Sequence, residues 1–207
     1  MTTGYSDRIN HAFAFAAKHH DRQVRKGTGL PYLTRPASVA IILTRYGCDE
    51  TAVVAGILHD VVEDCVRDGW TRDLMDDRIG EKFGADVLEI LLSVVQRRVG
   101  DTGAELAADE RRSDCLQRLT TASNLACWVM AACVLHEGSS LLTDLRRTVD
   151  ANVVWGRFKA SKSATVAWYR AVPARLGEVG FSAPIVAELD QLARALEASA
   201  KTPLPPN

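Results

Sequence analysis

Four ionisable residues, His59, Asp60, Glu63 and Asp64, stand within six positions directly after a strongly apolar run. At helical spacing His59 and Glu63 share one face, and Asp60 lies beside Asp64. An imidazole beside a carboxylate is a common start of a site for manganese, iron or zinc. A second acidic pair can place a water or exchange protons. The ordinary alternative is a solvated helix end, with His59 held by a core partner.

The apolar run before these residues indicates how they would be positioned. Residues 53–58 are apolar on every face of a helix, which predicts a helix that is buried on every side. Charged groups at the end of a buried helix are costly unless they pair with each other or with a metal. This helix, which starts at Asp49 or Thr51 and ends at Asp64, is therefore expected at the centre of the fold.

Helical periodicity recurs along the rest of the chain, whereas strand signals are scarce. Thr34 and Thr71 are expected to cap helices, and Gly47 to end one. Gly138 is expected to interrupt a second apolar helix, and Pro173 to kink or end a later one. The other expected helices cover residues 6–21, 34–47, 71–84, 85–98, 109–121, 124–137, 141–147, 158–176 and 184–200, with a turn at 149–152. We predict an all-α protein of about eight to ten helices.

The length of 207 residues favours one domain with additions. Residues 1–176 are assigned to the main domain and residues 177–200 to a C-terminal helical extension of it. The proline-rich residues 201–207 are expected to be a disordered tail. Five cysteines without a C-x-x-C pair are expected to be reduced and buried.

The charge pattern argues against nucleic acid and membrane as partners. The net charge is −1, and the short basic pairs at residues 97–98 and 111–112 are expected to lie on solvated faces. The N-terminus lacks the pattern of a signal peptide, and no run of 18 apolar residues predicts a membrane span. A cytoplasmic location is expected.

Several segments of this chain occur together in one known family. The specific block consists of Arg25-Lys26-Gly27, Pro31-Tyr32, Pro36, Val39-Ala40 and residues 58–64. Weaker matches follow in the right order at Phe83-Gly84, Leu135-His136, residues 144–147, residues 155–158 and Trp168-Tyr169. With these segments, residues 8–176 resemble the HD hydrolase domain of the RelA/SpoT-type alarmone enzymes. They are most similar to the small, hydrolase-only members.

The resemblance implies a single HD domain of about ten helices with a bound metal, usually manganese. It also implies removal of the 3′-diphosphate from guanosine tetra- or pentaphosphate. By resemblance, the functional residues are catalytic Glu63 and Asp64, phosphate-binding Arg25 and Lys26, and metal-binding His59 and Asp60.

Two of the four metal positions of that family carry other residues in this chain. Arg35 stands where the family has a His before the proline of the second helix, and Cys133 stands at a distant Asp. Glu137 replaces the usual Asn beside His136 and adds negative charge where a phosphorylated substrate would lie. Arg35, His136 and Glu137 are expected to contact the substrate.

The residue types indicate what these replacements do to the metal. Arg has no lone pair to donate and keeps its proton in proteins, so Arg35 is not a ligand. If Arg35 points inward, it repels a divalent cation and neutralises Asp60 in a salt bridge, which is the favoured interpretation. Cys133 either completes a zinc site with His59 and Asp60 or is a buried apolar filler, and we favour the filler. The expected cofactor is none, or a non-standard zinc or manganese ion.

Three functions remain open. The preferred one is a divergent enzyme that acts on a phosphorylated or anionic small molecule, with Glu63 and Asp64 as its acid–base pair. The second is a non-catalytic pseudo-hydrolase that binds a nucleotide or a protein partner. The third is an active metal-dependent alarmone hydrolase whose site is completed by another residue. The expected partner is a small anionic or nucleotide-like ligand, and homodimer formation is also allowed.

Overall fold

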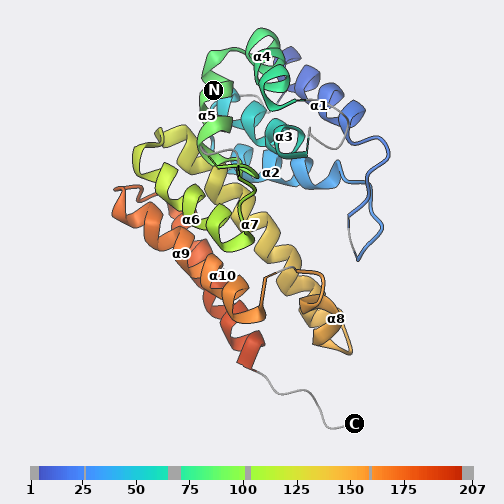
Figure 1. Cartoon of the computed structure of the whole chain (residues 1–207), viewed down its shortest axis with the longest axis vertical. Coiled ribbons are helices and arrows are strands. Elements are labelled where there is room, and N and C mark those ends of the chain that lie inside the picture. The colour runs from blue at the N-terminus through green and yellow to red at the C-terminus, as the bar shows by residue number, and fades with distance from the viewer. Residues whose placement is uncertain (1–4, 26, 65–70, 101–103, 159, 202–207) are drawn as a thin grey trace.

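The computed structural model describes residues 5–25, 27–64, 71–100, 104–158 and 160–201, apart from the side chain of Asp64. Every element of regular secondary structure within those ranges is a helix, so the prediction of an all-α protein is confirmed (Figure 1). The α-helices are α1 (Asp7–His19), α2 (Thr34–Arg45), α3 (Glu50–Asp64), α4 (Arg72–Phe83), α5 (Ala85–Val94), α6 (Ala108–Arg118), α7 (Asn124–Arg147), α8 (Ala151–Trp155), α9 (Lys162–Glu178) and α10 (Pro184–Lys201). A short 3₁₀ turn, Leu119–Thr121, links α6 to α7.

The third helix, α3, lies at the centre of the fold, as its sequence predicts. Every residue from 52 to 62 is buried, and Ile57 and Leu58 are fully so. The helix packs against α1, α2, α5 and α7 (Figure 1). Gly56 permits the close approach of α2, because a Cβ there would lie 2.5 Å from the side chain of Leu43. Burial on all sides carries the ionisable end of α3 into the interior.

The other apolar helix, α7, is one unbroken helix of 24 residues, which corrects the expectation that Gly138 interrupts it. Gly138 faces two later helices. A Cβ at this position would lie 2.6 Å from the side chain of Leu192 and 2.8 Å from the ring of Tyr169. The glycine therefore serves the close packing of α7 against α9 and α10, and a helix interior tolerates it at a modest cost.

The unbroken α7 is also long and apolar enough, by length and composition alone, to cross a membrane, although no span is predicted from the sequence. In the described part of the chain, 72% of its most apolar window is buried inside the fold. A helix that is surrounded by protein has the same apolar composition as a membrane span. The position of α7 in the core therefore explains its composition.

Local signals place most helix ends correctly. The Thr71 side chain accepts a hydrogen bond from the backbone N–H of Leu74 at the start of α4. Gly47 follows α2 with a φ of 70°, a conformation that favours glycine. Thr34 is the exception, because it is the first residue of α2 and not its cap; its hydroxyl donates to the carbonyl of Pro31 at 2.8 Å.

The C-terminal helices pack against α7. The ninth helix continues through Pro173 to Glu178, so this proline does not end it. The last helix, α10, packs along both α7 and α9 (Figure 1). Residues 151–155 form the short helix α8, which begins within the turn that the sequence predicts at 149–152. The division at residue 176 stays a prediction, Lys201 belongs to α10, and the remaining expected tail lies outside the described residues.

Candidate active site

Three helices bring the predicted site residues together. Arg35 stands in the first turn of α2, His59 and Asp60 stand near the end of α3, and His136 and Glu137 stand within α7. The side chains of His59, Asp60 and His136 are buried. The carboxylates of Asp60 on α3 and Glu137 on α7 both raise the pKa of Arg35 on α2, so charges on the three helices act on one another. Positions about a hundred residues apart thus form one cluster.

The ring of His59 is held in one tautomer. Its Nδ1 lies 2.7 Å from the carbonyl oxygen of Gly56, and because a carbonyl only accepts, Nδ1 carries the proton. Burial lowers the pKa of His59 in spite of the nearby Asp60 carboxylate, so the ring is neutral near pH 7. Its Nε2 lone pair then lies 3.2 Å from Oδ1 of Asp60. Two acceptors at this distance repel each other unless a proton or another cation lies between them.

Asp60 receives a compensating positive charge from Arg35. The Nε of Arg35 lies 3.2 Å from Oδ2 of Asp60, whose side chain is only 2% exposed. The hydroxyl of Tyr32 also hydrogen-bonds to this carboxylate. Burial opposes ionisation of Asp60, but the positive charge of Arg35, together with the Tyr32 hydroxyl, outweighs it and holds the pKa of Asp60 below its usual value. The ion pair expected from the sequence is therefore present at this centre.

The side chains at this centre do not fit the four-ligand metal site that the resemblance implies. The Nε2 of His59 and the carboxylate of Asp60 provide two donors with a suitable separation. The guanidinium of Arg35 occupies the other side of the same carboxylate, and its fixed charge repels a divalent cation. Among the described residues, no group of three or more His, Cys, Asp or Glu side chains is arranged to hold a metal ion.

Cys133 does not make up for the missing ligand in this arrangement. Burial raises the pKa of its thiol well above the ordinary value, although Arg35 acts in the opposite direction. Without a bound metal, a protonated buried thiol behaves as a small apolar side chain. The zinc site of His59, Asp60 and Cys133 gains no support from this geometry and stays a prediction. The other cysteines that the structure describes are also buried and are not in disulfide bonds: Cys48, Cys115 and Cys127.

A cavity of about 560 Å³ opens beside this centre. Its volume is that of a typical binding site for a small molecule. The predicted site residues that line it are Arg25, Arg35, Glu63 and Glu137. Lys26 and the side chain of Asp64, which are also predicted site positions, lie outside the described residues.

His136 lies close to this cavity as a buried, neutral imidazole. Burial, together with the positive charges of Arg25 and Arg35, lowers its pKa to about 4. Within the part of the chain that the structure describes, its Nε2 is buried without a hydrogen-bond partner. A neutral imidazole with an uncommitted nitrogen can donate to or accept from a bound ligand.

Three further arginines, Arg98, Arg111 and Arg157, line the same cavity. This corrects the expectation that Arg98 and Arg111 lie on solvated faces. The backbone N–H of Leu106 donates to the carbonyl of Arg98 at 2.8 Å, which folds the connection between α5 and α6 back on itself. This reversal of the chain brings Arg98 and Arg111 to the cavity. The glycine-bearing loop after Arg98 is the one sequence feature that could have indicated it.

Arg25 is available to an incoming anion. It is half-buried and forms no ion pair with any described residue, whereas Arg111 pairs with Glu105 at 3.1 Å and Arg157 pairs with Asp144 at 2.6 Å. The backbone N–H of Arg25 donates to the carbonyl of Leu30 at 2.8 Å, which anchors its loop. Among the described residues, the cavity thus combines a cation that has no ion-pair partner with the carboxylates of Glu63 and Glu137.

Comparison with known proteins places this chain in a family. The HD domain family matches residues 12–133, which is more than half of the chain. The chain belongs to the HD domain family.

The relatives of known sequence are much longer proteins. The chain is 31% identical over 116 residues to a GTP pyrophosphokinase of Myxococcus xanthus, and this match covers 56% of the chain and 14% of the relative. It is 34% identical over 92 residues to a guanosine-3′,5′-bis(diphosphate) 3′-pyrophosphohydrolase of Aquifex aeolicus, covering 44% of the chain and 12% of that enzyme. The chain therefore matches only a small part of each relative.

Solved structures share the fold over nearly their whole length. A metazoan ortholog of SpoT that hydrolyses ppGpp has a TM-score of 0.70 and 25% identity, covering 92% of this chain and 96% of that chain. A protein of Listeria monocytogenes EGD-e has a TM-score of 0.63 and 26% identity, covering 77% of this chain and 96% of its own. The predicted relationship to ppGpp hydrolases is confirmed.

Proposed function

We propose that this HD-domain protein binds a phosphorylated small molecule in the arginine-lined cavity and hydrolyses it without the four-ligand metal centre. The observation that carries the proposal is the ion pair between Arg35 and Asp60, with Nε and Oδ2 3.2 Å apart. This pair stands at the position where the resemblance implies the four-ligand metal centre. The names of the relatives favour guanosine 3′,5′-bis(diphosphate) or a similar nucleotide as the ligand.

The cavity lining supports an anionic ligand. Arg25 has no ion-pair partner among the described residues, and Arg35 keeps its charge because Asp60 and Glu137 raise its pKa against the effect of burial. Guanidinium groups bind phosphate oxygens in pairs of charge-assisted hydrogen bonds. Glu137 lines the same cavity and disfavours the most highly phosphorylated ligands by repulsion.

The proposed reaction is an attack of water on phosphorus with departure of the ribose oxygen. Glu63, which lines the cavity, takes a proton from the attacking water. Arg25 and Arg35 stabilise the negative charge that spreads over the phosphoryl oxygens. The departing oxygen receives a proton from the acid of the pair, which we assign to Asp64 from its position in the sequence.

Binding is tested by titrating guanosine 3′,5′-bis(diphosphate) into the metal-stripped chain. We expect Arg25→Gln to weaken binding about tenfold, which corresponds to the loss of one charge-assisted hydrogen bond. Arg194→Gln is the matched control, because Arg194 is exposed on α10 and does not line the cavity. Equal affinities of the Arg25 variant and the native chain would contradict binding in this cavity.

Hydrolysis is tested with the same compound in the presence of a strong chelator. We expect slow release of pyrophosphate by the native chain, and none by Glu63→Gln, which should still bind the ligand. Turnover that appears only after manganese is added would overturn the metal-independent reaction.

A non-catalytic binding function is the second candidate, and the same ion pair favours it. In that case Arg35 acts only as a structural substitute for a metal, since a neutralised Asp60 no longer polarises a water or a phosphate. The titration would then show binding that Arg25→Gln weakens, while the native chain and Glu63→Gln would be equally inactive with and without manganese.

A further inference from the structure

The loop that carries Arg25 is held in shape by its own backbone. This α1–α2 loop, residues 20–33, projects from the helices on the side of α8 (Figure 1). Besides the hydrogen bond of Arg25 described above, the N–H of Gly29 donates to the carbonyl of Arg25 at 3.0 Å, and the N–H of Tyr32 donates to the carbonyl of Gln23 at 3.0 Å. These bonds lie within the loop, so the position of its tip over the cavity depends on contacts with other parts of the chain.

Arg157, which follows α8, makes such a contact at Gly27. Gly27 lies at the tip of the loop with a φ of 89°, a conformation that favours glycine. A Cβ at this position would lie 2.3 Å from Cζ and 2.4 Å from Nη1 of Arg157. The guanidinium group therefore occupies the space that a side chain would need at residue 27 and lies directly against the backbone of the loop.

The acid that holds Arg157 in this position is Asp144. Nη1 of Arg157 lies 2.6 Å from Oδ2 of Asp144, and the two side chains are only 27% and 30% exposed. Asp144 belongs to α7, the helix that also carries His136 and Glu137. Arg25, Arg157 and Asp144 all line the cavity. The ion pair and the contact at the loop tip thus connect the loop to α7 along the wall of the cavity.

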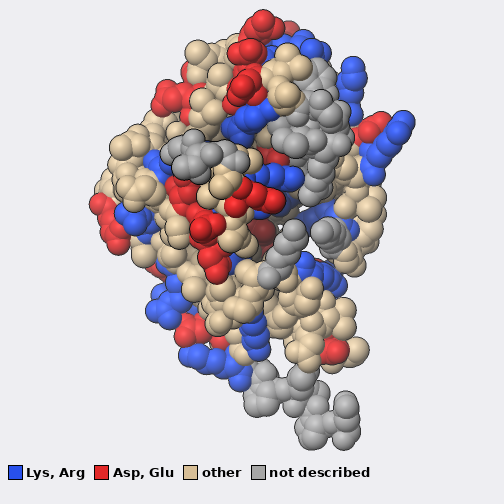
Figure 2. All heavy atoms as spheres, viewed as in Figure 1, with Lys and Arg blue, Asp and Glu red and all other residues tan. Residues whose placement is uncertain are grey.

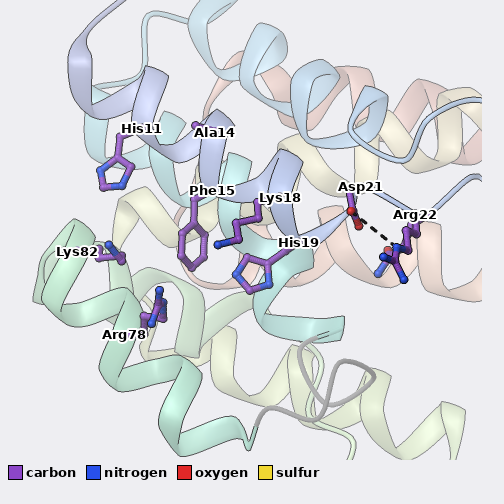
Figure 3. A pocket seen from close by; sticks show the side chains of 10 residues that line it. His11, Ala14, Phe15, Lys18, His19, Asp21, Arg22, Arg78 and Lys82 are labelled. Atoms are coloured by element: carbon purple, nitrogen blue, oxygen red, sulfur yellow. Dashed lines mark ion pairs between the residues drawn. The ribbon is translucent and has the colours of Figure 1, made fainter.

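Position, rather than total charge, decides whether an arginine of this loop can bind an anion in the cavity. The net charge of the protein is −1, and acidic and basic residues are interspersed over the face seen in Figure 2. Arg22 belongs to the same loop, but it lines another cavity, between α1 and α4, and is 93% exposed beside Asp21 (Figure 3). Because water screens charges that are not held close together, Arg25 acts on a ligand in the cavity only while the loop keeps it there.

We propose that Arg157 is a positioning residue: through its contact with Gly27 and its ion pair with Asp144, it holds the loop so that Arg25 reaches the ligand. The inference rests on the proposed binding of a phosphorylated molecule by Arg25. It gives Asp144 a role that favours binding, because without this acid the guanidinium group is no longer held against the loop. Charge alone predicts the opposite, since Asp144 is a negative group beside an anionic ligand.

The position of the loop is tested first without a ligand, by hydrogen exchange of the full chain. We expect Arg157→Gln to speed the exchange of the Arg25 and Tyr32 amides about tenfold, because the loop then opens more often. Arg22→Gln, which removes an equal charge from the same loop, is the control and should leave both rates unchanged. Equal exchange in the native chain and in Arg157→Gln would overturn the proposal.

Gly27→Ala tests the same contact from the side of the loop. Its Cβ would displace the guanidinium group of Arg157, so we expect faster exchange of the Tyr32 amide, as in Arg157→Gln. Gly29→Ala is the matched control, because Gly29 also has a positive φ, of 68°, but nothing lies within 4 Å of a Cβ there. The strain of alanine at a positive φ is common to both variants, so equal exchange in the two would contradict the role of the contact.

The effect on the ligand is tested by titration of the full chain with guanosine 3′,5′-bis(diphosphate). We expect Asp144→Asn and Arg157→Gln each to weaken binding about tenfold, and neither to weaken it further in the Arg25→Gln background. Tighter binding by Asp144→Asn would overturn the proposal. So would a loss in Arg157→Gln that adds to the loss in Arg25→Gln, because Arg157 would then bind the ligand by its own charge.

The two measurements separate this proposal from the proposed function. If the native chain binds no ligand while hydrogen exchange responds as expected, the proposed function fails and the positioning of the loop is supported. If Arg25→Gln weakens binding but Arg157→Gln and Asp144→Asn do not, the proposed function is supported and the positioning role fails.

Discussion

A buried carboxylate needs a compensating charge, and the choice of Arg35 for Asp60 decides the chemistry of this centre. A metal would give Asp60 a divalent partner with open positions for water and substrate. A guanidinium gives a single fixed charge that donates hydrogen bonds and never binds a water as a Lewis acid. His59 keeps a lone pair towards Asp60, so this centre retains part of the geometry of a metal site without its ligand set.

Removal of Arg35 should show how much the ion pair contributes to stability. Arg35→Met leaves Asp60 buried without its main cation, and we expect unfolding free energy to fall by about 3–5 kcal/mol. The measurement is urea unfolding at neutral pH. The matched control is Arg35→Met combined with Asp60→Asn, which should recover part of the loss because no buried charge is left unpaired. A loss below about 0.5 kcal/mol in the single variant would mean that the pair contributes little.

At the scale of the elements, the long helix α7 connects the site to the C-terminal helices. Cys133, His136 and Glu137 stand at the site, and Gly138 is the next residue along the same helix. The contact of Gly138 with α9 and α10 therefore fixes the position of the helix that carries these side chains.

Substitution of Gly138 tests this packing. A Cβ would lie 2.6 Å from Leu192 and 2.8 Å from Tyr169, so we expect Gly138→Ala to destabilise the protein by about 1–3 kcal/mol. Gly177→Ala in α9 is the matched control, because nothing lies within 4 Å of a Cβ at that position. The control should be neutral or more stable by up to about 1 kcal/mol, since alanine favours a helix. Equal effects of the two substitutions in thermal unfolding would contradict the packing role.

The same elements show what the sequence could predict. The central position of α3 followed from an apolar run on all faces, which leaves few alternatives in a helical protein. The ion pair of Arg35 followed from the resemblance, which aligns Arg35 with a metal position beside Asp60, and from the residue type, because Arg keeps its positive charge. Gly138 was misinterpreted because a glycine required for tertiary contact has the same local signature as a helix break. Arg98 and Arg111 were missed because the reversal of the chain that brings them to the cavity depends on contacts between separate positions, which local sequence patterns do not show.

At the scale of the whole molecule, buried histidines should make stability depend on pH. The pKa of His136 in the folded protein is about 4, below the ordinary value of 6.5. Below pH 6.5 the unfolded chain takes up a proton at this residue while the folded chain remains neutral. The contribution of His136 is therefore fully present above pH 6.5 and is lost as the pH falls towards 4. The lowered pKa of His59 acts in the same direction.

This pH dependence can be measured by urea unfolding at a series of pH values. We expect the unfolding free energy to fall by about 2 kcal/mol through His136 alone between about pH 7 and about pH 5. The variant His136→Gln, which has no proton to bind, should lose that part of the decrease. An unchanged slope in the variant would mean that another group causes it.

The central claim is that Arg35 takes the place of the metal at Asp60. The most direct test is a calorimetric titration of the metal-stripped native chain with Mn²⁺ and with Zn²⁺, beside the variant Arg35→His combined with Cys133→Asp. Asp60→Ala in each background is the control. We predict no tight binding by the native chain and a gain of Mn²⁺ binding in the double variant that Asp60→Ala abolishes. Tight binding by the native chain that Asp60→Ala removes would contradict the claim.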